Sequence, residues 1–225
     1  MERENAQHMR QMILDAAVKL FQAKGYINTS MDEIAEAVGL TKGGLYHYVE
    51  KKEDLLKDIH DQILDAFFDR VGRAMEGEES PEKKVVKWIE AHASVTHDYL
   101  GHLKVFFTEI DNYSEEMLLA TVHKRQQAQE MLIGILQTGI SQGKIRADIN
   151  PKIVSFLLLG MMNWLYIWYR PNGPLGLDEI LSNMKKMVTD GLEKDLATGK
   201  GEAPHERSAG KEARDVQDDE PYSTV

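Results

Sequence analysis

The residues best suited to chemistry lie close together, between Ser30 and Leu56. Near the middle of this stretch, a short run combines hydroxyl, ammonium and imidazole groups with two adjacent glycines. Its outward-facing residues are Thr41, Lys42, Gly43, Gly44, Tyr46 and His47. Such side chains donate hydrogen bonds to phosphates and base edges. The glycines would let the backbone approach closely, although each costs a helix about 1 kcal/mol relative to Ala. The run therefore indicates contact with nucleic acid.

Two short helices joined by a tight turn are predicted to present these residues. Ser30 stands three residues before Glu33, which is the spacing of a capping box at the start of a helix. Gly39 supplies the turn, and Thr41 caps the second helix. The predicted core between the two helices consists of Ile34, Ala35, Val38, Leu40 and Leu45. This arrangement is a helix-turn-helix.

Helical signals continue along the rest of the chain. No segment has the sustained period-two alternation of a strand, so the predicted fold class is all-α. About nine helices are expected, over residues 8–24, 30–38, 41–46, 52–75, 81–98, 103–110, 114–142, 151–169 and 178–197. We predict a three-helix DNA-binding domain over residues 1–52 and a larger helical domain over residues 53–197. Residues 198–225 are almost without apolar side chains and are predicted to be a disordered acidic tail.

Composition narrows the class of protein. The 225 residues include no cysteine, which excludes disulfides, a thiolate nucleophile and a cysteine-bound zinc, and fits a cytoplasmic location. The first residues are not followed by the apolar stretch of a signal peptide. The net charge is −10, yet the cations of residues 1–60 nearly balance the acids there. Since DNA binding depends on where cations lie, the overall charge does not exclude it.

The stretch from Gly39 to Leu56 resembles the recognition-helix signature of the TetR/AcrR family of regulators, and the resemblance extends over about residues 8–56. It implies that Thr41, Lys42, Gly43 and Gly44 meet the major groove of an operator in double-stranded DNA. It also implies phosphate contacts from Tyr46, His47 and Lys52, and one more from Thr29 or Ser30. The expected protein is a regulator, most simply a repressor, whose dimer binds an inverted repeat.

Residues 153–169 are apolar nearly all round and must therefore be buried or in lipid. The segment is shorter than the ~20 residues of a membrane span, contains Ser155 and Asn163, and is bounded by Pro151 and Arg170. Burial between the subunit's own core and a partner subunit fits better than a membrane. By the family resemblance, the eighth and ninth helices form the homodimer interface.

Residues 163–175 resemble the branch of the family that senses acyl-CoA thioesters and controls the breakdown of fatty acids or related acids. An acyl-CoA effector needs an apolar slot and cations for its phosphates. The expected slot residues are Trp88, Tyr99, Phe106, Phe107, Trp164 and Trp168. The expected phosphate partners are Arg125, Lys124 or Arg170. For any single one of these aromatic residues, a place in the ordinary core is the simpler interpretation.

Two other functions stay open at this point. One alternative effector is a drug or another hydrophobic compound, with efflux as the controlled process. Alternatively, His92, His97 and His102 with nearby carboxylates would make a small metal-dependent enzyme. Their five-residue spacing advances about 140° per step around a helix, so they do not share a face. Since no catalytic motif stands out, we expect no catalytic residues, no metal and no cofactor.

Overall fold

The computed structural model describes residues 2–193, and within that range the chain forms ten α-helices, one 3-10 turn and no strand. The first three helices, called the head below, are α1 (Glu2–Lys24), α2 (Met31–Ala37) and α3 (Lys42–Tyr46). The others, called the bundle, are α4 (Lys52–Met75), α5 (Pro81–Asp98), α6 (Leu100–Thr108), α7 (Glu115–Ser141), α8 (Pro151–Asn163), α9 (Leu165–Trp168) and α10 (Leu177–Leu192), with the 3-10 turn η1 (Ile110–Asn112) before α7. The all-α prediction is confirmed.

The predicted helices correspond to the observed ones with two main differences. The first helix begins at Glu2, before the expected residue 8. The predicted eighth helix is interrupted at Trp164, whose backbone ends α8 and begins α9. The domain boundary at residue 52 stays a prediction, because α4 begins there and packs against both α1 and α5. The predicted tail and the end of the predicted ninth helix lie outside the described residues.

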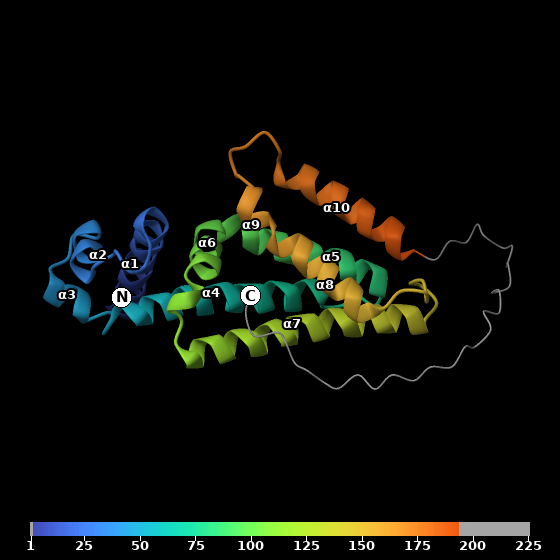
Figure 1. The fold of residues 1–225 in the computed structure, drawn as a ribbon, viewed down its shortest axis with the longest axis horizontal. Helices are drawn as coiled ribbons and strands as arrows, with labels where there is room; N and C mark the ends of the chain where they lie inside the picture. The colour runs from blue at the N-terminus through green and yellow to red at the C-terminus, as the bar shows by residue number, and fades with distance from the viewer. Residues whose placement is uncertain (1, 194–225) are drawn as a thin grey trace, which may run out of the picture. The chain divides into compact units, whose positions relative to one another are not determined.

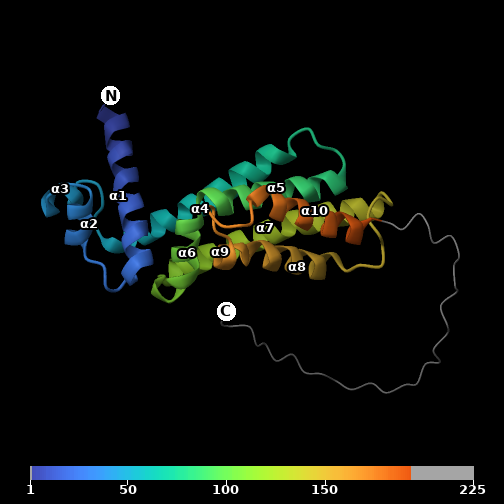
Figure 2. The ribbon, with the colours of Figure 1, turned by 90° about the horizontal axis from the view of Figure 1, so that it is seen from above.

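The head gathers at the N-terminal end of α4, while α5, α6 and α7 pack on the rest of that helix (Figures 1 and 2). Helix α8 packs on α7, α9 packs on α6, and α10 packs on α5. The two short helices of the head begin as the sequence predicts. Ser30 and Glu33 form a reciprocal capping box, and the Thr41 hydroxyl accepts a hydrogen bond from the amide of Gly44. Gly39 has a φ of 71°, a conformation that favours glycine at the turn. These local signals fix the angle at which α3 leaves α2.

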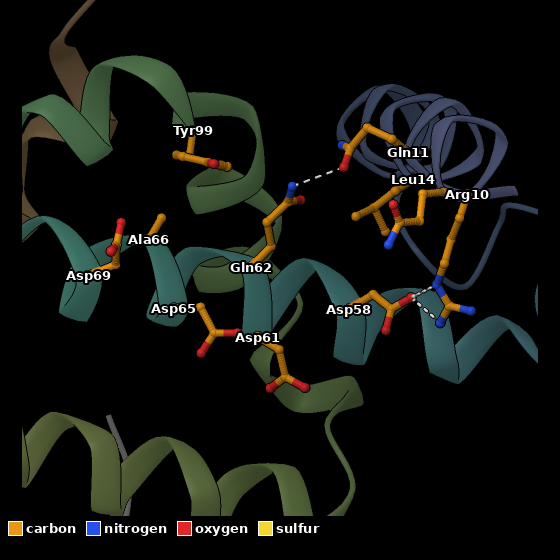
Figure 3. Close-up of a pocket in the computed structure, with 11 residues that line it drawn as sticks. Arg10, Gln11, Leu14, Asp58, Asp61, Gln62, Asp65, Ala66, Asp69 and Tyr99 are labelled. Atoms are coloured by element: carbon orange, nitrogen blue, oxygen red, sulfur yellow. Dashed lines mark hydrogen bonds and ion pairs between the residues drawn. The ribbon is translucent and has the colours of Figure 1, made fainter. Parts of the chain in front are cut away.

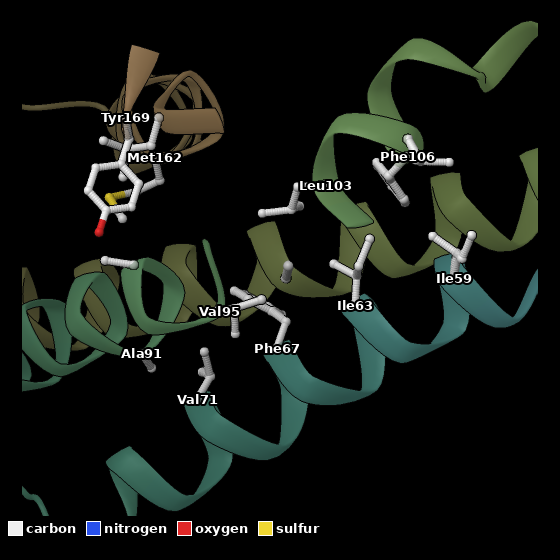
Figure 4. Close-up of a cluster of buried hydrophobic side chains, with 14 of the residues drawn as sticks. Ile59, Ile63, Phe67, Val71, Ala91, Val95, Leu103, Phe106, Met162 and Tyr169 are labelled. Carbon is white, nitrogen blue, oxygen red and sulfur yellow. The ribbon is translucent and has the colours of Figure 1, made fainter. Parts of the chain in front are cut away.

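A row of apolar side chains on α4 forms the centre of the bundle (Figure 4). The row consists of Ile59, Ile63, Phe67 and Val71, all at most 7% exposed. Their spacing of four residues keeps them on one helix face. That face meets α5, α6 and α7, and each such buried side chain stabilises the fold by about 1.5–3 kcal/mol. The same row therefore links the elements that carry most of the predicted slot residues.

The apolar segment Pro151–Trp168 is long and apolar enough to cross a membrane by composition, yet only 22% of it is buried in the subunit. Its inner face packs on α7, where Gln129 donates a hydrogen bond of 3.1 Å to the hydroxyl of the fully buried Ser155. Its outer face is open, with Phe156 56% exposed and Leu157 66% exposed. One half of the segment is thus core, and the other half is an apolar surface.

The end of α7 gives a test of this packing. A Cβ on Gly139 would lie 2.4 Å from Cδ1 of the buried Ile145, whereas a Cβ on Gly134 would meet nothing within 4 Å. We predict that Gly139→Ala lowers the free energy of unfolding by about 1–3 kcal/mol, because the core is overpacked. The matched Gly134→Ala on the same helix should be neutral or stabilising by up to about 1 kcal/mol. Thermal melts followed by circular dichroism compare the two. A Gly139→Ala protein that melts at or above the wild-type temperature contradicts the packing described.

Candidate nucleic-acid interface and effector slot

The outer face of α3 is open to solvent. Thr41, Lys42, Gly43, Tyr46 and His47 are all exposed, as their predicted role requires. The two glycines differ. A Cβ on Gly44 would lie 3.3 Å from the Thr41 hydroxyl that caps the helix, whereas a Cβ on Gly43 would meet nothing within 4 Å. Since no group of the described chain requires a glycine at position 43, its bare backbone suits a close approach by something outside the protein.

Lys42 is held in place by an ion pair across the turn. Its Nζ lies 3.0 Å from a carboxylate oxygen of Asp32, at the start of α2. The hydrogen bond to Asp32 raises the pKa of Lys42, so the ammonium stays charged at neutral pH. Both side chains are 61% exposed, and such a pair contributes only about 0–1 kcal/mol. A phosphate can therefore displace Asp32 from Lys42 at little cost.

Thr29 departs from its predicted role. Its side chain is only 2% exposed, and its hydroxyl donates a hydrogen bond of 2.9 Å to the carbonyl of Gly25. It therefore stabilises the loop between α1 and α2, and the surface contact expected of Thr29 is revised. The neighbouring Ser30 is exposed at the start of α2 and keeps its predicted place.

Lys52 also has a different role in the structure. Its Nζ donates hydrogen bonds of 2.7 Å and 2.9 Å to the carbonyls of Tyr26 and Thr29. The same ammonium lies 4.2 Å from the centre of the Tyr26 ring, and partial burial lowers the pKa of Lys52. With its donors used in this way, Lys52 braces the loop that precedes α2. We revise its assignment from phosphate contact to positioning residue.

Sequence reasoning missed two further connections of the head, because each joins residues far apart in the chain. Arg10 donates to the carbonyl of Tyr48 at 2.9 Å and pairs with Asp58 of α4 at 2.6 Å. Glu109, just after α6, accepts a hydrogen bond of 3.2 Å from the amide of Tyr26. These contacts tie the segment after α3 and the loop before α2 to α1 and the bundle.

Three of the predicted effector residues lie together between α6 and α7. The guanidinium of Arg125 lies 5.6 Å from the centre of the Phe106 ring and 5.7 Å from that of Phe107. Phe107 stacks on Tyr166 of α9 with 4.4 Å between ring centres. An arginine at the edge of an aromatic cluster has the two properties that an acyl-CoA site requires, a cation and an apolar slot.

Three other predicted effector residues lie elsewhere. Trp164 is 61% exposed and Trp168 is 40% exposed, so neither lines an interior slot. Arg170 donates to the carbonyls of Ile167 and Tyr169, both at 2.9 Å, and so closes the end of α9. The sequence pattern could not reveal this, because it does not show that the helix is interrupted at Trp164. Trp88, by contrast, is fully buried against Phe67 in the bundle.

Tyr99 lines a groove of about 610 Å³ between α1 and α4 instead of the aromatic cluster (Figure 3). Four aspartates of α4 face this groove, namely Asp58, Asp61, Asp65 and Asp69. Acidic side chains repel the phosphates of a CoA thioester. The groove is therefore not the predicted effector slot, and the assignment of Tyr99 is corrected accordingly.

The three histidines of the metal hypothesis do not converge. His92 is buried against Trp88, the ring of His97 lies 2.5 Å from the Tyr169 hydroxyl, and His102 packs against Tyr99. Within residues 2–193, no three histidine or carboxylate side chains are placed to share a metal ion. The geometry therefore gives no support to a metal-dependent enzyme.

Large apolar side chains are exposed along the C-terminal helices. They are Ile153, Phe156, Leu157, Trp164, Ile167, Trp168, Leu175 and Met187, which we call the apolar face. Isolated exposed apolar residues are ordinary, but a large exposed apolar surface is typical of an interaction site. It occupies the segments that the sequence assigns to the dimer interface.

Two family models match the chain. The model described as "Bacterial regulatory proteins, tetR family" matches residues 13–59, and the model described as "Tetracyclin repressor-like, C-terminal domain" matches residues 78–192. The first contains the helix-turn-helix, and the second extends from just before α5 to the end of α10. Together they cover both the head and the bundle.

Known proteins match over the same range. The HTH-type transcriptional repressor KstR2 of Rhodococcus jostii is 29% identical over 194 residues, which cover 81% of this chain and 90% of the relative. The structure of the regulator PfmR from Thermus thermophilus has a TM-score of 0.74 and 31% identity, and covers 81% of this chain and 99% of that chain. The structure of AibR in complex with isovaleryl coenzyme A and operator DNA has a TM-score of 0.70 and 27% identity, over 80% and 97% of the two chains.

The revised role of Lys52 can be tested by its salt dependence. We predict that Lys52→Met weakens binding to duplex DNA and lowers the free energy of unfolding by about 1–3 kcal/mol, because two backbone carbonyls lose their donor. The slope of log K against log salt should stay at the wild-type value. In Lys42→Met, that slope should fall by about 1, as expected for a lost phosphate contact. Lys19→Met, at an exposed position of α1, is the stability control. If the slope falls by about 1 in Lys52→Met, Lys52 contacts a phosphate, and its assignment as a positioning residue is contradicted.

Proposed function

This chain belongs to the TetR family of bacterial regulatory proteins, and we propose that it is a homodimeric repressor that an acyl-CoA releases from its operator. The DNA-binding part of the proposal rests on the open face of α3. There a Cβ on Gly43 would meet nothing within 4 Å, and Lys42 is held only by an exposed ion pair with Asp32. Thr41, Lys42, Gly43 and Gly44 would read the major groove, and Tyr46, His47 and Ser30 would contact phosphates. A regulator of this kind acts on chromosomal DNA, so we assign it to the cytoplasm.

The apolar face supports the dimer. Its members lie on α8, α9, the following loop and α10, and they would be covered when two subunits pair through the eighth and ninth predicted helices. Pairing would place two heads on successive major-groove faces of an inverted repeat, about 34–36 Å apart or a multiple of that distance. Because the head has nearly balanced charge, affinity would depend on both heads binding at once.

The aromatic cluster supports an acyl-CoA effector. Phe106, Phe107 and Tyr166 would surround the acyl group, and Arg125 would face the CoA phosphates. AibR, a structural relative, has been solved with isovaleryl coenzyme A and operator DNA, and we extend the same class of effector to this chain. A regulator of this type would control genes for breakdown of fatty acids or related acids.

Helix α6 supplies a route from the effector to the head. Its Phe106 and Phe107 belong to the aromatic cluster, while its Gly101 lies against α1, where a Cβ would be 2.6 Å from the Gln22 amide. Glu109, which follows α6, holds the amide of Tyr26. A ligand that displaces the two phenylalanines would shift α6 and, through these contacts, the head. Its effect on DNA binding is limited by the difference in its affinity for the two states.

Binding of DNA by α3 gives a direct prediction. Lys42→Ala should weaken operator binding about tenfold, and Tyr46→Phe should weaken it about two- to tenfold, because each removes one hydrogen-bonding group at the DNA. The dimer should stay intact in both, since neither residue belongs to the apolar face. Lys83→Ala, at an exposed position of α5, is the control. Gel shifts with undiminished affinity for both head variants would show that α3 is not the recognition helix.

The dimer is tested at Phe156, which is 56% exposed in the subunit. We predict that Phe156→Asp yields monomers in sedimentation velocity, because a charge is unfavourable in an apolar interface. Operator affinity should fall about 100-fold, since the two heads no longer bind together. Phe156→Leu keeps an apolar side chain and should remain dimeric. A Phe156→Asp protein that sediments as a dimer would place the interface elsewhere.

The effector class is tested by thermal shift. Decanoyl-CoA should raise the melting temperature of the wild-type protein, since a ligand bound only by the folded state stabilises it. Decanoic acid and cationic drugs should not, because they lack the CoA phosphates that Arg125 would face. Arg125→Gln should reduce the shift. Stabilisation by drugs but not by decanoyl-CoA would favour the alternative function, the control of efflux.

A further inference from the structure

His60 is a titratable side chain inside the bundle that the proposed function does not use. It lies on α4 and is only 1% exposed. Its ring stacks on Phe106 of α6, with 5.3 Å between ring centres, and lies edge-on to Tyr113, which precedes α7, at 5.7 Å. His60 therefore lies beside the aromatic cluster, at the place where α4, α6 and the start of α7 meet.

Both ring nitrogens of His60 have a hydrogen-bond partner. Nδ1 lies 3.0 Å from a carboxylate oxygen of Asp61. Since an ionised carboxylate only accepts hydrogen bonds, Nδ1 carries a proton. Nε2 lies 2.6 Å from the hydroxyl oxygen of Thr121 on α7, and that hydroxyl also lies 2.7 Å from the carbonyl oxygen of Met117.

This arrangement suits the ring in either protonation state. When the ring is neutral, Nε2 is an acceptor, and the Thr121 hydroxyl donates to it. When the ring is charged, Nε2 donates to Thr121, whose hydroxyl turns its own proton to the carbonyl of Met117. Both states are fully hydrogen-bonded, so His60 can gain a proton without movement of any heavy atom.

The charges around the ring decide which state is occupied. The side chains that face His60 are Lys57 and Asp61 of α4, Phe106 of α6, Tyr113 before α7, and Thr121 and Arg125 of α7. Burial lowers the pKa of His60, whereas the hydrogen bond and charge of Asp61 raise it. The charges of Lys57 and Arg125 lower it further, so the ring is neutral at neutral pH. Burial raises the pKa of Tyr113, which stays uncharged.

Arg125 is the member of this group whose charge the proposed effector would offset. Its guanidinium lies 5.6 Å from the centre of the Phe106 ring, the same ring on which His60 stacks. Arg125 is exposed, so a phosphate can reach it, while His60 is shielded from water. Two positive charges against one aromatic ring repel each other, and water screens that repulsion less at a buried group. An anion paired with Arg125 would relieve it.

We propose that an anionic effector group at Arg125 and a proton on His60 favour each other, so that the protein takes up a proton when it binds its effector. The proposal rests on the assignment of the effector to Arg125 and adds a form of regulation to that site. By linkage, the effector binds more tightly as the pH falls through the pKa that His60 has in the complex, and the gain is lost above it. A repressor with this link would leave its operator at lower effector concentrations in a more acidic cytoplasm.

Isothermal titration of the full-length protein with decanoyl-CoA tests the link. At pH 6.0, in two buffers of different ionisation enthalpy, it gives the number of protons taken up. We expect the wild type to take up about 0.3–0.6 of a proton more than His60→Gln, which keeps a hydrogen-bonding side chain but does not titrate. His8→Gln, at an exposed position of α1, should match the wild type. Protons bound by the CoA phosphates are common to all three proteins.

A second measurement needs no effector. In a magnetic resonance titration, the pKa of His60 should be about 0.5 higher in Arg125→Gln than in the wild type, because a repelling charge is gone. Lys124→Gln is the matched control. Its ammonium lies 4.9 Å from the ring centre of Phe68, about two turns further along α4, so its removal should change the pKa of His60 less.

The outcomes separate this link from the proposed function. If decanoyl-CoA binds and His60→Gln takes up as many protons as the wild type, the link is refuted and the acyl-CoA effector stands. If His60→Gln fails to fold, equal pKa values of His60 in the wild type and in Arg125→Gln refute the link. If decanoyl-CoA does not bind, the acyl-CoA effector is refuted. The link then stands or falls with the pKa comparison, since it concerns any anion at Arg125.

Discussion

The contact between α1 and α6 is the constraint on which the arrangement of this protein depends. Gly101 favours a close approach, because a Cβ there would lie 2.6 Å from Nε2 at the flexible end of Gln22 and 3.2 Å from Cγ1 of Val18. The backbone of α6 therefore lies directly on α1. Glu109 adds a further link, because it accepts a hydrogen bond from the amide of Tyr26 in the loop after α1. Since Phe106 and Phe107 belong to the same short helix, the head and the aromatic cluster share one rigid connection. In a two-state regulator, such an element transmits a small displacement instead of absorbing it.

The head was largely predictable because its determinants are local. The caps at Ser30 and Thr41 and the positive φ of Gly39 act within three or four residues, so spacing alone reveals them. Thr29 and Lys52 were assigned to DNA because of their place in the family signature, but their partners come from the loop at residues 25–29. A side chain that hydrogen-bonds to a backbone carbonyl leaves no periodic signal in the sequence. The same reason explains why Arg10 and Glu109 were missed.

The effector region was predictable in composition but not in orientation. The sequence identifies the aromatic residues, yet which of them face inward depends on the rotation of each helix and on the break at Trp164. Tyr166 stacks on Phe107, whereas Trp164 at the break and Trp168, on the same short helix as Tyr166, are exposed. His92 was considered only as a metal ligand. The structure buries it between Trp88 and Phe67, where sequence spacing alone could not place it.

We propose that one molecule both selects an operator and releases it in response to an acyl-CoA. The decisive experiment is to incubate the full-length protein with fragments of its own genome and to sequence the fragments that it retains, with and without saturating decanoyl-CoA. We expect a small set of retained fragments that share an inverted repeat and are lost when decanoyl-CoA is added. Fragments that share no repeat, or that are retained equally in both conditions, would contradict it.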